Sequence, residues 1–169
     1  MFFRTTFTAL GCLALCLSPG AAHADKPAAA MLLAAYRHMD TAAVRRDIKG
    51  YMAYDAPEFV TGVGNHVNRA RAASIVGMQM RYALWFKSKT RVRRIAVQGQ
   101  TAKVETQLHQ EFLSAFLMPD GKRQKYVFDY RNADTWDRRR GRWWRISSST
   151  VGMRVTINGK LRANKQVRP

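Results

Sequence analysis

Four stretches between residues 91 and 155 decide the fold, because the helical spacing of the preceding residues stops there and strand-like runs begin. They read RVRRIAV (91–97), TAKVETQLHQEFLSAF (101–116), KYVFDYRNADTWD (125–137) and RWWRISSSTVGMRV (142–155). Between them lie the turn-forming sequences QGQ (98–100), PDG (119–121) and RRG (139–141), at hairpin spacing. The pattern predicts an antiparallel meander of four strands.

The residues before this meander have the pattern of helices. Pro27 is tolerated in a first helical turn, and strong helix formers follow it. The elements expected there are a helix over 28–39, a short helix over 41–48, a strand over 51–63 and a helix from a cap at Asn68 to about Ser88. An apolar stripe on the last helix is expected to face the core, made of Ile75, Met78, Tyr82 and Trp85. Helices followed by such a meander predict an α+β fold in which the helices cover one sheet face.

The first 24 residues have the parts of a secretory signal peptide. Arg4 supplies a positive charge, an apolar stretch follows over 5–17, and AHA (22–24) is a cleavage site. Cleavage there would leave 145 of the 169 residues, lower the net charge from +18 to +17, and remove both cysteines, Cys12 and Cys16. The spacing around these cysteines fits a lipoprotein signal poorly, so we expect cleavage rather than lipidation. The sequence therefore predicts a periplasmic or secreted protein with no disulfide.

The rest of the chain is expected to form one domain over 25–153 and a basic C-terminal extension over 154–169, with residues 160–169 frayed. Basic residues gather at 87–94, 122–125 and 138–145, and we place the first two groups at one end of the sheet and the third at the other. This division predicts no nucleic-acid partner, since a continuous basic stripe with exposed aromatics is missing. An anionic envelope surface suits the charge. A basic but merely solvated surface is the alternative.

Several short segments resemble one known family. They are residues 40–56, GQTAKV (99–104), DTW (134–136) and GRW (141–143). In their order they resemble the nuclear transport factor 2-like superfamily, in particular its SnoaL-like and ketosteroid-isomerase-like bacterial members. The resemblance implies a cone-shaped, curved antiparallel sheet wrapped around N-terminal helices, a pocket at the open end, and often a homodimer through the outer sheet face. It implies no single activity, because this fold hosts both enzymes and binding modules.

The resemblance also implies where isomerase chemistry would lie. Such relatives use an aspartate base on the first strand, which falls near Val60 or Thr61, and a tyrosine donor, which falls near Leu32. Neither position offers the required group. Only the aspartic acid donor has a counterpart, Asp134. Steroid-type isomerisation is therefore disfavoured, although Glu58 or Tyr54 could substitute under a shifted alignment.

Asp134 is the most informative carboxylate of the sequence. Counting by twos places it on one strand face with the aromatic residues Tyr126, Phe128, Tyr130 and Trp136. Burial among aromatics would raise its pKa, as in active-site acids. The alternative is a structural aspartate bonded to backbone or to an arginine. By the same counting, Trp144, Ile146, Ser148 and Thr150 share a face on the next strand.

The histidines give little support for a metal or acid–base site. No histidine pair has metal-ligand spacing, so we expect no metal and no cofactor. His66 precedes the long helix, at an expected pocket rim, and is a candidate catalytic partner for Asp134.

These observations favour a binding protein over an enzyme. We expect a small, partly apolar ligand, with an acidic one allowed, in a pocket lined by Tyr54, Tyr82, Tyr130, Asp134 and Trp136. One alternative is an isomerase or dehydratase using Asp134 with a tyrosine or His66. The other is an envelope-associated accessory protein that acts through its basic surface.

Overall fold

The computed structural model describes residues 25–62 and 66–166, so the predicted signal peptide lies outside the described residues. Within them, no helix is long and apolar enough to cross a membrane. The helices are α1 (Lys26–Val44), α2 (Ile48–Tyr51) and α3 (Arg69–Arg81). The strands are β1 (Asp55–Gly62), β2 (Val67–Asn68), β3 (Ala83–Gln98), β4 (Thr101–Leu117), β5 (Arg123–Arg139), β6 (Arg142–Ile157) and β7 (Lys160–Gln166).

The strands form one curved sheet in the order β2-β1-β6-β5-β4-β3. The four predicted strands of the meander correspond to β3, β4, β5 and β6, and their hairpin connections are confirmed. The sheet is mixed rather than wholly antiparallel, because β1 runs parallel to β6. β1 pairs with the first half of β6, and β7 pairs with its second half. Both therefore lie along the same edge of β6.

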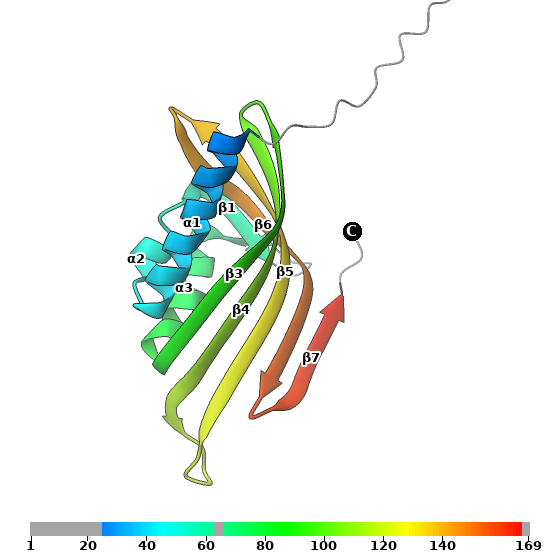
Figure 1. The fold of residues 1–169 in the computed structure, drawn as a ribbon. Coiled ribbons are helices and arrows are strands. Elements are labelled where there is room, and N and C mark those ends of the chain that lie inside the picture. The colour runs from blue at the N-terminus through cyan, green and yellow to red at the C-terminus, as the bar shows by residue number, and fades with distance from the viewer. Residues whose placement is uncertain (1–24, 63–65, 167–169) are drawn as a thin grey trace, which may run out of the picture.

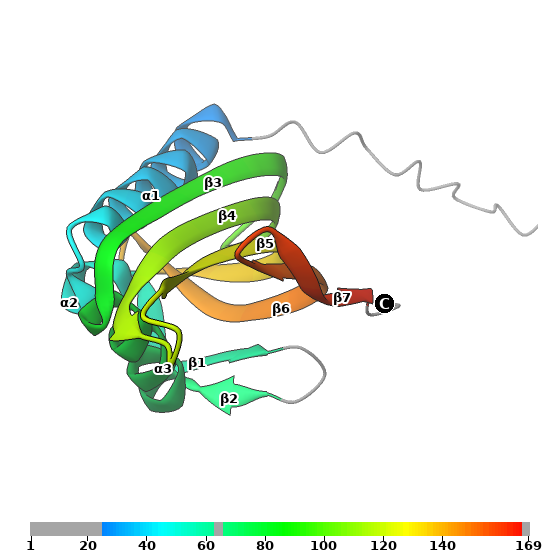
Figure 2. The same cartoon turned by 90° about the horizontal axis from the view of Figure 1, so that it is seen from below.

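The helices lie together on one side of the sheet, as the α+β expectation requires (Figure 1). Seen from below, β3 to β6 form a curved wall beside α1 and α3 (Figure 2). The main apolar cluster fills the space between α1 and the inner sheet face. Its fully buried members include Leu32, Ala43 and Trp136. The cone-shaped arrangement expected from the resemblance is thus present.

Two bulges on β6 change which side chains face the helices. The pairing with β5 passes from Asn132↔Thr150 to Arg131↔Gly152 and from Trp136↔Arg145 to Thr135↔Ser147, so Val151 and Ile146 are extra residues. Simple alternation would place Arg145 and Ser148 on opposite faces. Because Ile146 is skipped, Arg145 and Ser148 are both buried on the inner side. The prediction that Trp144 and Ile146 share a face with Ser148 and Thr150 is wrong for the same reason.

The predicted long helix ends earlier than expected. α3 begins after an Asn68 cap that accepts a hydrogen bond from the Arg71 N–H at 3.0 Å, but it stops at Arg81, and Trp85 belongs to β3. The predicted core stripe is wrong, since Met78 is 57% exposed and Tyr82 is 41% exposed. The buried face of α3 carries Ala72 and Met80 instead. Their small and flexible side chains let the helix lie close to the sheet.

Two further expectations, one about the C-terminal residues and one about the first helix, are wrong. Residues 160–166 do not fray, because β7 pairs with β6 from Ile157↔Lys160 to Gly152↔Gln166. The first helix does not break at Asp40, which lies inside α1. Asp40 instead faces β3: its carboxylate accepts hydrogen bonds from the Thr90 N–H at 2.6 Å, the Thr90 hydroxyl at 2.9 Å and the Ser88 hydroxyl at 2.8 Å.

Replacing Asp40 tests this link between α1 and the edge strand. We expect Asp40→Ala to lower the free energy of unfolding by about 1.5–3 kcal/mol, because bonds to a charged acceptor are lost and a backbone N–H is left without its partner. Urea denaturation measures the change. Thr41→Ala, which removes an exposed local bond to the Arg37 carbonyl, is the matched control and should cost under about 1 kcal/mol. Equal small losses in both variants would contradict the link.

Candidate functional site

The inner face of the sheet contains a cavity of about 240 Å³, bounded by β1, β4, β5, β6 and α3. This is smaller than the usual range of about 300–1,000 Å³ for sites that hold drug-sized ligands. One part of its wall is apolar and includes Met52, Phe59, Val76 and Leu108. Another part is polar and includes Asp55, Gln110, Asn132, Arg145 and Ser148. The cavity therefore suits a small molecule with both an apolar body and a polar group.

A buried ion pair forms the charged end of the cavity. The Arg145 guanidinium Nε donates to Asp55 Oδ1 at 2.7 Å, and both side chains are almost fully buried. Asp55 begins β1, and its register partner on β6 is Arg145. The parallel pairing of β1 with β6 therefore places the two charges side by side. A second arginine nitrogen, Nη1, lies 4.0 Å from Asp134 Oδ2.

Behind this pair, Asp134 belongs to a buried hydrogen-bonded chain. The Tyr36 hydroxyl on α1 donates to Asp134 Oδ2 at 2.5 Å. The Trp136 indole Nε1–H in turn donates to the Tyr36 hydroxyl oxygen at 2.9 Å. All three side chains are at least 97% buried. The chain ties the first helix to β5 through polar contacts inside the apolar cluster.

The burial of these groups shifts their pKa values. Burial raises the pKa of Asp134, and the positive charge of Arg145 only partly opposes this. Burial also raises the pKa of Tyr36 well above its usual value, and the charge of Asp134 adds to the effect. Burial would lower the pKa of Arg145, but the negative charges of Asp55 and Asp134 outweigh it and raise the pKa. Arg145 therefore stays charged inside the protein, and Asp134 holds a proton more strongly than an exposed aspartic acid does.

Two polar atoms of the cavity wall are buried and lack hydrogen-bond partners. They are the Gln110 side-chain Nε2, a donor, and Asp55 Oδ2, an acceptor. A buried polar group without a partner costs about 1–3 kcal/mol. Both residues line the cavity, but the two atoms themselves are not accessible from it, so a bound molecule would bond them only after a small movement of the side chains. They define the polar requirements of such a molecule.

The structure brings together only some of the residues predicted for the pocket. Tyr130 lines the cavity. Asp134 lies behind Arg145, and Trp136 is completely buried in the core. Tyr54 packs against His38 and Trp136, with ring centroids 5.6 and 6.3 Å apart.

Two other candidates lie away from this group. Tyr82 is 41% exposed and stacks on Phe116, with ring centroids 4.8 Å apart. His66 is exposed and immediately precedes Val67, a residue of the cavity wall, but the structure gives it no contact with Asp134. No group of three or more potential metal-ligating side chains occurs in the part of the chain that the structure describes.

The positions carried over from the resemblance can also be located. Thr61 lines the cavity and donates its hydroxyl to the Ser148 carbonyl at 2.9 Å. Glu58 is exposed and bonded to Arg139, which lowers the pKa of its carboxyl. Leu32 is buried, and the tyrosine that meets Asp134 is Tyr36, one helical turn later.

Sequence reasoning missed Arg145, Asp55 and Tyr36 as site residues. Arg145 was grouped with the surface arginines of residues 138–142, because alternation does not reveal the bulge at Ile146. One signal was available: Arg145 is a charged residue inside the otherwise apolar and small run WWRIS (143–147). The alternative of a structural Asp134 bonded to an arginine is close to what is observed.

The raised pKa of Asp134 predicts a defined pH dependence of stability. In the pH range above the ordinary value of 3.8, native Asp134 holds its proton more strongly than unfolded Asp134. Its contribution to stability is therefore full below that pH and is lost as the pH rises towards the native pKa. Asp134→Asn keeps an oxygen acceptor for Tyr36 and removes the titration.

We therefore expect the free energy of unfolding of the parent protein, minus that of Asp134→Asn, to decrease between about pH 3 and pH 7. Urea denaturation at several pH values measures this difference. An increase of this difference with pH would show that the charge of Arg145 lowers the pKa of Asp134 by more than burial raises it. That result would contradict the raised pKa of Asp134.

Comparison with known proteins identifies the fold. No protein-family model and no curated protein sequence matches the chain. A solved structure of a candidate scytalone dehydratase from Novosphingobium aromaticivorans matches with a TM-score of 0.65 at 9% identity, over 84% of this chain and 93% of the other.

Two further structures agree. A candidate dehydratase of the nuclear transport factor 2-like family from Streptomyces avermitilis has a TM-score of 0.56 at 15% identity, over 74% of this chain and 95% of the other. A nuclear transport factor 2-like protein of unknown function from Pseudomonas putida has a TM-score of 0.53 at 14% identity, over 74% and 86%. With its N-terminal helices, curved mixed sheet and inner cavity, the chain has the fold of the nuclear transport factor 2-like superfamily.

Proposed function

We propose that this protein binds a small, neutral, partly apolar molecule in the inner cavity and holds it without chemical change. The observation that carries the proposal is the partly apolar cavity of about 240 Å³, two of whose lining residues, Gln110 and Asp55, each have a buried polar atom without a hydrogen-bond partner. Gln110 Nε2 would donate to an oxygen of the ligand. Asp55 Oδ2 would accept from a hydroxyl or amine of the ligand.

The charge balance of the site favours a neutral ligand. The cation nearest the cavity, Arg145, is already paired with Asp55 at 2.7 Å. A second carboxyl, Asp134, lies 4.0 Å from the same guanidinium. An anionic ligand would compete with two carboxyl groups for one arginine and would be desolvated without a free partner. The acidic ligand allowed by the sequence is therefore the less favoured choice.

Catalysis is a second candidate, and one observation favours it. Asp55 lines the cavity from the first strand, which is where the resemblance implies a base, although it comes five residues before Val60. Dehydratases share this fold, including the structures described above from Novosphingobium and Streptomyces. In such an enzyme, Asp55 would remove a proton from the substrate, and Gln110 would donate a hydrogen bond to the oxyanion that develops. Asp134 and Tyr36 would act from behind Arg145 without touching the ligand.

The location of this binding follows from the sequence alone. We propose that residues 1–24 export the protein, so that it meets its ligand in the periplasm or outside the cell. The predicted homodimer would leave the inner cavity unaffected, because the resemblance places the dimer contact on the outer sheet face.

Native mass spectrometry of the protein, produced with residues 1–24 and purified from the periplasm of a bacterial host, tests the binding. We expect a small-molecule adduct on the parent protein. Val76→Trp should remove the adduct by filling the cavity, and Gln110→Leu should weaken it without lowering stability, because an unpartnered donor disappears. Ser74→Trp, on the exposed side of α3, is the control and should keep the adduct.

Two outcomes would change this account. If Val76→Trp and Ser74→Trp retain the adduct equally, the molecule binds elsewhere and the cavity proposal is wrong. If the released molecule is chemically altered after incubation with fresh protein, catalysis replaces simple binding. Extraction and mass analysis before and after incubation separate these cases.

A further inference from the structure

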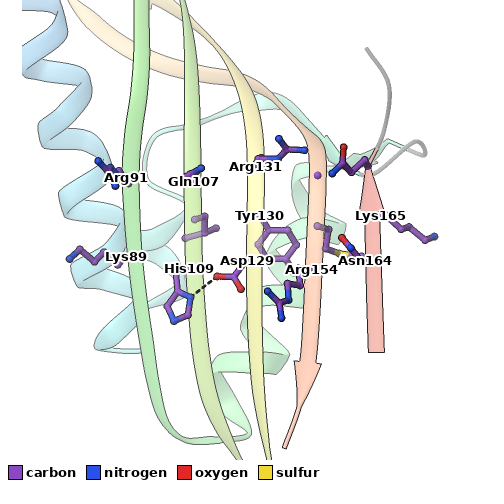
Figure 3. A pocket seen from close by; sticks show the side chains of 14 residues that line it. Lys89, Arg91, Gln107, His109, Asp129, Tyr130, Arg131, Arg154, Asn164 and Lys165 are labelled. Atoms are coloured by element: carbon purple, nitrogen blue, oxygen red, sulfur yellow. Dashed lines mark hydrogen bonds and ion pairs between the residues drawn. The ribbon is translucent and has the colours of Figure 1, made fainter. Parts of the chain in front are cut away.

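The sheet face that points away from the helices carries a second hollow, of about 510 Å³ (Figure 3). Five basic side chains from four strands line it. They are Lys89 and Arg91 on β3, Arg131 on β5, Arg154 on β6 and Lys165 on β7. The sequence expectation places the group of Lys89 and Arg91 at one end of the sheet and gives no place to Arg131 or Arg154. The five residues meet on the middle of the outer face because β3 is longer than predicted and β7 folds beside β6.

The positive charge in this hollow is not balanced by the protein itself. None of the five side chains forms an ion pair with any residue of the described ranges 25–62 and 66–166. One carboxylate lines the hollow, Asp129, and its Oδ1 lies 2.7 Å from His109 Nδ1. Five cations in one concavity repel one another and attract anions from solution.

One of the five cations, Arg131, lies beside a glycine on the neighbouring strand. Arg131 pairs with Gly152 on β6, and its guanidinium crosses the space that a side chain at residue 152 would fill. A Cβ atom there would lie 2.7 Å from Arg131 Nε. Gly152 therefore leaves room for the Arg131 guanidinium to lie over β6, and a side chain at residue 152 would displace it.

We propose that this hollow binds a compact polyanion that carries two or more phosphate groups. Arginine donates two parallel hydrogen bonds to phosphate oxygens, and lysine adds a mobile point charge. Neighbouring strands lie about 4.8 Å apart, so cations on β5, β6 and β7 are spaced to contact successive phosphate groups. The phosphates could belong to a soluble ligand or to a lipid headgroup.

The charge also argues against a second copy of the chain as the occupant of the hollow, and so against this part of the outer face as the contact of the homodimer that the resemblance implies. A two-fold symmetric dimer through this face would set two sets of five cations against each other. A polyanion satisfies the same groups without that repulsion. The hollow and the inner cavity lie on opposite faces of the sheet, so binding at one does not depend on binding at the other.

Calorimetric titration of the protein, lacking residues 1–24, with inorganic tripolyphosphate tests the site at about 50 mM salt. We expect Arg91→Gln/Arg154→Gln to bind at least about tenfold more weakly than the parent protein. The control Arg71→Gln/Arg81→Gln removes the same charge from exposed positions on α3 and should stay within about threefold of the parent. Equal weakening in both variants would overturn the proposal.

Gly152→Ala separates geometry from charge. It leaves the net charge unchanged but displaces the Arg131 guanidinium, so we expect several-fold weaker binding of tripolyphosphate. Unchanged affinity would show a diffuse basic surface rather than a formed site, and would contradict the proposal.

Vesicles distinguish the two sources of phosphate. If vesicles of cardiolipin, whose headgroup carries two phosphates, bind the protein through Arg91 and Arg154 while phosphatidylcholine vesicles do not, the ligand is a lipid headgroup. If only tripolyphosphate binds through these residues, the ligand is soluble. Either result supports the site, and failure of both probes overturns it.

Discussion

The ion pair between Arg145 and Asp55 is the contact on which the inner side of this protein depends. A buried guanidinium is stable only if a carboxylate lies against it and its hydrogen bonds are satisfied. Asp55 does this from β1, at 2.7 Å, and so fixes the one parallel strand pairing of the sheet beside β6. The same guanidinium reaches towards Asp134, which Tyr36 connects to α1. A single charged side chain thereby links β1, β5 and the first helix.

This arrangement also explains why a cavity is present at all. The bulge at Ile146 turns both Arg145 and Ser148 inward, so polar groups occupy part of a face that would otherwise be apolar. Polar side chains keep their hydrogen-bond geometry and do not collapse into the neighbouring core as aliphatic ones would. The space between them and α3 remains open, and Gln110 and Asp55 are among the residues that line it. The cost of two unpartnered polar atoms is consistent with a site kept for a ligand.

The sequence predicted the meander and the inward face of β5 well, and for a physical reason. The pairing of β5 with β4 is regular from Asp137 to Lys125, so counting by twos correctly places Tyr130, Asp134 and Trp136 together. The same counting failed on β6, where extra residues shift the face twice. It failed on α3 because Met78 and Tyr82 have the spacing of a core stripe but point to solvent. Local pattern does not reveal bulges or which helix face meets the sheet, since tertiary packing decides both.

The two faces of the sheet differ in how charge is balanced. On the inner face, one arginine is paired with a carboxylate, whereas on the outer face five cations remain unpaired within the described chain.

A double-mutant cycle of Asp55→Asn and Arg145→Met, followed by urea denaturation, tests the inner arrangement most directly. Each single change should lower the free energy of unfolding by about 3–5 kcal/mol, because it leaves a buried charge or polar group unpaired. The double variant should lose at least about 2 kcal/mol less than the sum of the two. Losses that add to within about 0.5 kcal/mol would show that the two side chains act independently, and would contradict the account.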